Sequence, residues 1–256
     1  MRILYLGNNW LGYQILKWLK EQEEEVVGLV VHPKGKGKYR DEIIKCSALG
    51  QDAIFDGSQL NQDKVSRAIK NLQPAIGISV MFGYILRPQF LAIFPKGVIN
   101  LHPAYLPYNR GAYPNVWSIV DGTPAGVTIH YIDAGVDTGD IILSCEVPIE
   151  AVDTGESLYH KLENALTRLF VEAWPLIKSG KAPRIAQENK MATHHNVSDV
   201  ERIDRIDLNR NYKAQDLINI IRARTFFPHK GGYFELENGR RVFLRLQLFY
   251  EEEIDQ

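Results

Sequence analysis

Two polar side chains, Asn100 and His102, lie two residues apart directly after the apolar residues 97–99. Side chains two apart on a β-strand point to the same side of the sheet. The asparagine amide can bind a carbonyl oxygen that gains negative charge, and the imidazole can move protons near neutral pH. The pair therefore suits attack on a carbonyl group, although on its own such a pair is more often a strand-end cap with a hydrogen-bonded histidine.

A third candidate for chemistry is Asp137, which lies between Gly135 and Gly139 and can therefore occupy a sharp turn. A carboxylate there could orient an imidazole and favour its protonated form. Asp133 and Asp140 belong to the same stretch, so spacing alone leaves open which acid matters, and a solvated turn is the simpler alternative.

Residues 103–117, PAYLPYNRGAYPNVW, combine an arginine with three tyrosines and three prolines. Arg110 suits recognition of a phosphate or carboxylate, and the tyrosines could stack on a base. The alternative is a surface loop stiffened by proline.

Glycines 7 and 12 lie in GNNWLG, between a predicted first strand and first helix, where a ligand can approach a helix N-terminus. The pattern is not that of a dinucleotide site, because His32 ends the second strand where an acid would be needed. Asn9 and Trp10 could face a ligand, and Trp10 could equally anchor the helix.

Other histidines and lysines are given plainer interpretations. His130 lies within a predicted strand and is expected to be a satisfied core histidine, and His194 with His195 lacks the neighbours that a metal site needs. The basic stretch 33–42 is expected to be a mobile, solvated loop.

The elements that must position these residues alternate along the chain. Strands are predicted at 2–7, 25–32, 75–80, 97–100, 125–133 and 140–149, and helices at 10–20 and 61–72. Apolar strands that alternate with helices favour an α/β fold with a mostly parallel sheet. A long helix follows, with Asp153 and Glu156 as its capping box, one face formed by 158, 162, 166, 169, 173 and 176, and Gly180 at its end.

The last 76 residues are predicted to be a polar linker over 181–211, a helix over 213–224 and a β-hairpin over 232–249. The hairpin would turn at Asn238-Gly239 with type I′ geometry. Apolar residues on both faces of the hairpin predict that it pairs with its copy in a second subunit.

Composition excludes several classes of protein. The 256 residues carry a net charge of −1, which argues against a nucleic-acid partner. No apolar run reaches the length that crosses a bilayer, the first residues do not resemble a signal peptide, and two cysteines form no disulfide framework. A cytoplasmic protein without a membrane partner is expected.

Residues 97–142 resemble the core of the formyltetrahydrofolate-dependent formyltransferases. The chain carries Asn-x-His-Pro, Leu-Pro, Arg-Gly, Gly-Val-Thr-x-His and Asp-x-Gly-x-Asp-Thr-Gly in the family's order, with Ala104 where many members have serine. The resemblance implies a Rossmann-like formyltransferase core, catalytic roles for Asn100, His102 and Asp137, N10-formyltetrahydrofolate as donor, and no metal. It also implies a donor site formed by Met81, Phe82, Gly83, Tyr84, Ile85, Leu86, Asp133 and Gly135.

The tail after the long helix looks like that of the nucleotide-sugar N-formyltransferases, a small C-terminal helix and β-hairpin. This implies a formyltransferase catalytic domain over 1–185, a linker and small subdomain over 186–256, and a homodimer formed through the hairpin. The acceptor would be a dTDP-linked amino-dideoxysugar, with 4-amino-4,6-dideoxyglucose favoured, used for surface polysaccharide such as O-antigen. Substrate contacts are predicted for Asn9, Trp10, Tyr105, Asn109, Arg110, His229 and Lys230.

Three alternatives stay open. One is a hydrolase that releases formate from the donor, and the second is an enzyme like the methionyl-tRNA or glycinamide ribonucleotide formyltransferases. The third is a nucleotide-binding module without catalysis, which would not need Asn100, His102 and Asp137 together.

Overall fold

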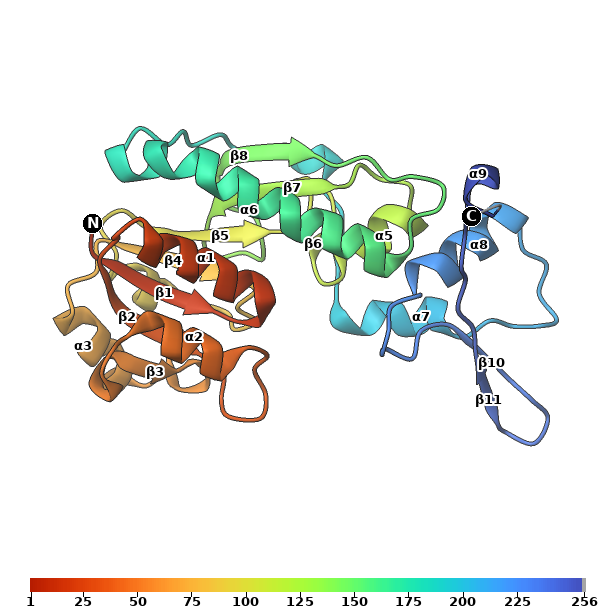
Figure 1. Ribbon diagram of the computed structural model, residues 1–256, viewed down its shortest axis with the longest axis horizontal. Coiled ribbons are helices and arrows are strands. Elements are labelled where there is room, and N and C mark those ends of the chain that lie inside the picture. The colour runs from red at the N-terminus through yellow and green to blue at the C-terminus, as the bar shows by residue number, and fades with distance from the viewer. Residues whose placement is uncertain (255–256) are drawn as a thin grey trace. The chain divides into compact units, whose positions relative to one another are not determined.

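The computed structural model describes residues 1–254, and its chain divides into two units (Figure 1). Unit 1 contains Met1–His102, Thr128–Ser144 and Leu166–Gln187. Unit 2 contains Pro103–Val127, Cys145–Ala165 and the segment that begins at Glu188. The chain thus leaves unit 1 directly after His102 and returns at Thr128. The predicted domain boundary at residue 185 stays a prediction.

Helices and strands alternate along the first part of the chain. The strands are β1 Ile3–Gly7, β2 Val26–Val31, β3 Ile54–Asp56, β4 Ile76–Val80, β5 Val98–His102, β6 Arg110–Gly111, β7 Gly126–Tyr131, β8 Ile141–Glu146, β9 His194–His195, β10 Tyr233–Glu235 and β11 Arg241–Phe243. The helices are α1 Asn9–Glu21, α2 Arg40–Ser47, α3 Asp63–Asn71, α4 Pro88–Leu91, α5 Pro114–Val120, α6 Gly155–Ser179, α7 Glu201–Asp204, α8 Ala214–Ala223 and α9 Glu251–Ile254. Short 3-10 turns occupy Gln51–Ala53, Gly57–Gln59, Asn189–Met191 and Val197–Val200.

Seven strands form one sheet in the order β3-β2-β1-β4-β5-β7-β8. Neighbours from β3 to β5 are parallel, and β5 pairs antiparallel with β7 (Figure 1). All residues of β1 and β4 are buried, as expected for central strands covered on both faces. The predicted α/β class with a mostly parallel sheet is therefore confirmed.

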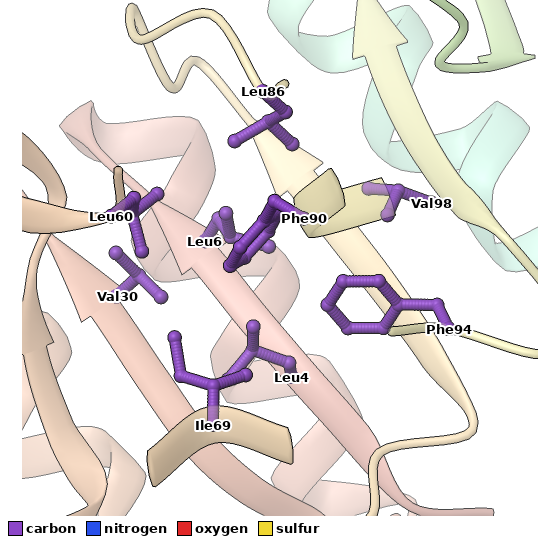
Figure 2. Close-up of a cluster of buried hydrophobic side chains, with 9 residues drawn as sticks. All are labelled: Leu4, Leu6, Val30, Leu60, Ile69, Leu86, Phe90, Phe94 and Val98. Atoms are coloured by element: carbon purple, nitrogen blue, oxygen red, sulfur yellow. The ribbon is translucent and has the colours of Figure 1, made fainter. Parts of the chain in front are cut away.

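A cluster of buried apolar side chains holds unit 1 together (Figure 2). Strands contribute Leu4, Leu6, Val30 and Val98, helix α3 contributes Ile69, and the segment around α4 contributes Phe90 and Phe94 (Figure 2). The cluster also includes Leu86, which is 5% exposed. The core therefore fixes the carboxyl end of the loop that follows β4.

The long helix α6 begins and ends with recognisable capping residues. Thr154 and Ser157 exchange side chain-to-backbone hydrogen bonds at its start, at 3.2 and 3.0 Å, so the predicted capping box is wrong by one residue. Asp153 instead accepts hydrogen bonds from Glu150 N–H and from the Ser157 hydroxyl. Gly180, with φ 72°, follows the last helical residue as predicted.

The apolar face predicted for α6 is correct except at its end. Leu158, Leu162, Leu166, Leu169 and Ala173 are buried, whereas Leu176 is 39% exposed. Ile177 is buried in place of Leu176. None of the helices described between residues 1 and 254 is both long enough and apolar enough to cross a membrane.

The C-terminal hairpin is present but shorter than predicted, with β10 pairing with β11 over three residues each. Its turn is not type I′, because Gly239 has φ 78° while Asn238 has no positive φ. Gly239 N–H donates to Leu236 O at 2.9 Å, which closes a turn centred one residue earlier. An Asn-Gly pair therefore supplied the left-handed residue without setting the turn type.

Candidate active site

Strand β5 carries Asn100 and His102 at its carboxyl end, inside unit 1. In the antiparallel ladder with β7, Asn100 lies opposite His130 and His102 lies opposite Thr128. His102 is 6% exposed, and Asn100 is half-buried. Because both neighbouring strands fix the backbone of β5, these side chains project from a rigid element.

Asp137 approaches His102 from the loop between β7 and β8. The distance from His102 Nε2 to Asp137 Oδ2 is 3.6 Å, and the two side chains are 7% and 15% exposed. This separation becomes an ion pair when the imidazole is protonated, and it is longer than an ordinary hydrogen bond. The structure thus brings the three predicted catalytic residues of unit 1 together, and of the three acids in this loop it is Asp137 that lies against the imidazole.

His130 joins this group, although the sequence predicted only a satisfied core histidine. Its side chain is buried as predicted, with Nε2 3.5 Å from Asp137 Oδ1 and 3.3 Å from Asn100 Nδ2. Nδ1 lies 2.8 Å from the Tyr131 carbonyl oxygen, which accepts, so Nδ1 carries a proton. In neutral His130, Nε2 therefore accepts a hydrogen bond from the Asn100 amide. In protonated His130, Nε2 carries a proton that faces Asp137 Oδ1.

Ser79 on β4 fixes the orientation of the Asn100 amide. Its hydroxyl donates to Asn100 Oδ1 at 2.9 Å, which leaves the amide nitrogen on the side of His130. Ser79 is 2% exposed, so water does not compete for this bond. The donor end of the amide is consequently held in place before any ligand binds, which is the arrangement that oxyanion binding needs.

The loop after β4 contains the six residues predicted to hold the formyl donor. Asn8 Nδ2 donates to Met81 O at 3.3 Å, and Gly83 N–H donates to His32 Nε2 at 3.4 Å. The rings of Phe82 and Tyr84 lie edge-on to His32, with centroids 5.3 and 5.0 Å away.

Within the same loop Ile85 is 75% exposed and Leu86 is buried in the core (Figure 2). Burial lowers the pKa of His32 from 6.5, opposed by the nearby Asp56 carboxylate. His32 is a contact of this loop that the sequence did not indicate.

Asp133 and Gly135, also predicted to contact the donor, build the turn that carries Asp137. Asp133 Oδ1 accepts from Gly135 N–H at 3.0 Å and from the Thr138 hydroxyl at 2.6 Å. Both residues are exposed. Their contact with a donor stays a prediction.

The first βα turn, which contains Asn8 and Asn9, is hydrogen-bonded to the basic loop at Lys38. Asn9 has φ 67°, and its N–H donates to Lys38 O at 2.9 Å, while Asn8 Oδ1 accepts from Lys38 N–H. The basic loop is therefore attached to this turn, while Lys34, Lys36 and Lys38 are exposed, as predicted for a solvated loop. Trp10 is half-buried in the first turn of α1.

The remaining predicted contact residues belong to unit 2, where Tyr105 is half-buried. Asn109 is fully buried, and its amide contacts Ser118, Thr123 and Thr193. Arg110 is 7% exposed, and its Nη2 donates to Asn189 Oδ1 at 3.0 Å.

The segment that holds Asn109 and Arg110 is part of the predicted linker. Strand β9 pairs with β6 over two residues each, so His194 and His195 lie beside Arg110 and Gly111. His195 also stacks on Trp117 at 4.1 Å and lies 3.2 Å from Asp121 Oδ2, and burial lowers its pKa.

His229 and Lys230 lie in an exposed loop of unit 2. His229 packs edge-on against Phe226, and Lys230 Nζ lies 6.0 Å from the Phe243 ring. Their contacts with a substrate, like those of the other unit 2 residues, stay predictions. Among the residues that the structure describes, no group of three or more His, Cys, Asp or Glu side chains is placed to hold a metal ion.

Two family models match the chain. The model described as formyl transferase matches residues 1–174, and that described as N-formyltransferase dimerization C-terminal domain matches residues 199–250. Methionyl-tRNA formyltransferase from Desulforamulus reducens is 31% identical over 234 residues, which cover 89% of this chain and 73% of that protein. The dTDP-4-amino-4,6-dideoxyglucose formyltransferase of Mycobacterium bovis is 35% identical over 178 residues, 66% of this chain and 73% of that protein.

Solved structures of similar fold include two formyltransferases. A 4-N formyltransferase from Francisella tularensis superposes with a TM-score of 0.82 and 26% identity, over 97% of this chain and 98% of that one. The formyltransferase PseJ from Anoxybacillus kamchatkensis, in complex with UDP-4,6-dideoxy-4-formamido-L-AltNAc and tetrahydrofolate, is 32% identical, with a TM-score of 0.57 over 79% of this chain and 89% of that one.

Proposed function

The chain belongs to the formyl transferase family and is an N-formyltransferase, and from this premise we propose that it moves a formyl group from N10-formyltetrahydrofolate to a sugar nucleotide. The acceptor is the amino group of a dTDP-linked amino-dideoxysugar, with dTDP-4-amino-4,6-dideoxyglucose favoured. The product serves surface polysaccharide such as O-antigen, and the enzyme works in the cytoplasm.

The single observation that carries the proposal is the cluster at the end of β5. An amide donor held by Ser79, an imidazole and a carboxylate 3.6 Å from that imidazole meet within unit 1. Acyl transfer to an amine needs these three groups: one to bind the carbonyl oxygen, one to take the amine's proton and one to stabilise the resulting imidazolium. A binding module without catalysis has no use for the combination.

The loop of residues 81–86 offers suitable groups for the donor's flat pterin ring. Tyr84 and Phe82 present aromatic surface, and Ile85 projects an exposed apolar side chain. The loop contains no helix or strand, so its main chain can serve as hydrogen-bond donor and acceptor to a heterocycle. When bound there, the donor supplies the electrophilic formyl carbon. The PseJ complex with tetrahydrofolate supports this choice of donor.

Each catalytic residue then has a defined task. His102 accepts, at a ring nitrogen, the proton that the acceptor amine loses as its nitrogen bonds to the formyl carbon. Asp137 stabilises the imidazolium, and His102 can return the proton to the departing nitrogen of the donor. Asn100 Nδ2 donates to the formyl oxygen as negative charge develops, a contribution that is typically worth about 100- to 1000-fold in rate.

Three observations support this choice of acceptor. A net charge of −1 gives little attraction for tRNA, whose binding depends on many cationic contacts. The C-terminal residues 199–250 match the dimerization domain of N-formyltransferases. The similar Mycobacterium bovis and Francisella tularensis proteins are a dTDP-4-amino-4,6-dideoxyglucose and a 4-N formyltransferase, which favours an amine at C-4.

We further propose a homodimer formed through the C-terminal hairpin. Its strands and turn carry apolar side chains that are well exposed in the single chain: Leu236 at 41%, Val242 at 37% and Phe243 at 40%. A two-stranded hairpin is marginal in water and needs covering. A second copy of the same hairpin supplies that cover.

Turnover assays with several acceptors test the proposal. Purified enzyme and N10-formyltetrahydrofolate are incubated with the 4-amino and 3-amino dTDP-sugars, methionyl-tRNA, glycinamide ribonucleotide or no acceptor, and calorimetry measures dTDP binding. We expect dTDP to bind and the 4-amino sugar to be formylated fastest. Fast turnover without acceptor would indicate a hydrolase. Formylation of methionyl-tRNA without dTDP binding would overturn the assignment of a dTDP-sugar as acceptor. Equal turnover of both sugars would remove only the preference for C-4.

A further inference from the structure

The loop that carries Asp137 needs support from outside itself. Asp137 has φ 54°, the left-handed conformation that residues other than glycine avoid. Two glycines in the same loop, Gly135 and Gly139, give its backbone additional freedom. The Asp133 side chain closes the turn internally through Gly135 and Thr138, but these bonds do not tie the loop to the rest of unit 1.

Gln187 supplies a tie from a segment that the sequence predicted to be linker. Its side-chain Nε2 donates to Asp137 O at 2.9 Å and to Gly139 O at 2.7 Å, so one amide group spans the residues on both sides of Thr138. Gln187 lies 50 residues after Asp137, and its side chain is half-buried.

The position of Gln187 is itself fixed by the sheet. Ile185 and Ile141 exchange two backbone hydrogen bonds, at 2.8 and 3.0 Å, in an antiparallel bridge. Ile141 is the first residue of β8. The bridge therefore attaches the backbone two residues before Gln187 to the start of the strand that follows the Asp137 loop.

We propose that Gln187 is a positioning residue for catalysis, which holds the Asp137 carboxylate against His102. The inference rests on the proposed function, because it assigns Gln187 a role only through Asp137. Without the two hydrogen bonds, the strained backbone at Asp137 relaxes and the carboxylate moves from its 3.6 Å contact. A displacement of about 1 Å in a catalytic group can cost about 100-fold in rate.

The first test replaces Gln187 by methionine, which keeps the length and neutrality of the side chain and removes both donors. We expect kcat to fall by roughly 10- to 100-fold, with KM for both substrates within about threefold and the unfolding temperature within a few degrees. Glu188→Met is the matched control, because Glu188 is the exposed neighbour, and it should retain wild-type kcat. Unchanged kcat in Gln187→Met, or a fall confined to KM, overturns the inference.

A double-mutant cycle shows whether Gln187 acts through Asp137. In an Asp137→Asn background, Gln187→Met should change kcat by less than about twofold, because the carboxylate it positions is gone. The full loss persisting in that background overturns the inference. Asp137→Asn with wild-type activity would instead refute the proposed catalytic group, so the two failures are distinguishable.

A second variant covers the case in which methionine prevents folding. Gln187→Glu preserves the shape of the side chain but places oxygen against both carbonyls, so it should lower kcat at least as much. Wild-type kcat in a folded Gln187→Glu enzyme contradicts the proposal.

Discussion

Replacing Asn109 by alanine should destabilise unit 2 rather than merely weaken substrate binding. Its Nδ2 donates to Ser118 Oγ at 2.9 Å and to Thr123 Oγ1 at 2.8 Å, and its Oδ1 accepts from Thr193 Oγ1 at 3.2 Å. The side chain is 0% exposed, so water cannot replace these bonds without rearrangement. Each neutral buried hydrogen bond contributes about 1 kcal/mol net, which gives about 3 kcal/mol for the three.

A further loss comes from the backbone, because Asn109 has φ 55°. Alanine in the left-handed region costs about 1 kcal/mol or more, whereas asparagine tolerates it. The expected total for Asn109→Ala is therefore about 4 kcal/mol, a large part of the 5–15 kcal/mol that keeps a typical domain folded. Asn109→Gly removes the same hydrogen bonds without the backbone penalty and should lose about 3 kcal/mol by the same reasoning.

Urea unfolding followed by tryptophan fluorescence measures this loss. The four tryptophans include Trp117, which belongs to unit 2, so its signal reports on the affected unit when the other three are replaced by phenylalanine. Parallel assays give KM for the acceptor. A loss below about 1 kcal/mol, accompanied by a tenfold rise in the acceptor KM, would refute this reasoning and establish Asn109 as a direct substrate ligand.

Four other outcomes are expected. His102→Asn should leave folding intact and lower kcat by about 100-fold or more, because the general base is lost; activity within tenfold of wild type would contradict that role. Asp137→Asn should lower the rate at neutral pH, and an unchanged pH–rate profile would count against it. Burial lowers the pKa of His32 and His195, so the unfolded chain binds more protons below about pH 6.5, and the urea midpoint should fall as pH decreases from 7 to 5; a level or rising midpoint would argue against this. Val242→Glu should give a monomer by sedimentation at micromolar concentration, and a monomeric wild-type enzyme would contradict the proposed dimer.

The sequence predicts the parallel half of the sheet because its strands are apolar throughout, a pattern that depends only on local burial. It does not reveal which strand pairs with which. His130 was interpreted as an ordinary core residue because periodicity gives the side of the strand but not the partner. The antiparallel pairing of β7 with β5 is what places it opposite Asn100.

Tertiary hydrogen bonds are the features that the sequence reveals least. Asn109 resembles a loop residue available to ligands, yet three hydroxyl groups from positions as far as 84 residues away surround its amide. The stretch 181–211 lacks periodicity and was predicted to be linker, but Gln187 reaches the Asp137 loop and β9 pairs with β6. Such contacts need few residues and leave no periodic signal.

At Leu176 and Asn238 the sequence pattern predicts the right element, a helix and a hairpin, but the wrong detail within it. The apolar repeat of α6 continues to Leu176, but that side chain is 39% exposed, and Ile177 is buried instead. Asn238-Gly239 favours a hairpin, yet the turn begins at Leu236, so only Gly239 adopts a positive φ.

The division of the chain directly after His102 has a consequence for how such an enzyme diversifies. Asn100, His102, His130 and Asp137 all belong to unit 1, whereas residues 103–127, which follow His102 without a break and include the predicted contact residues Tyr105, Asn109 and Arg110, belong to unit 2. Mutations in residues 103–125 change no residue of the ladder between β5 and β7, because β7 begins at Gly126 and pairs with β5 from Thr128 onwards. Exchanging residues 103–125 between relatives therefore keeps every residue of the β5–β7 ladder, and acceptor assays on such chimaeras measure how much of the specificity this segment carries.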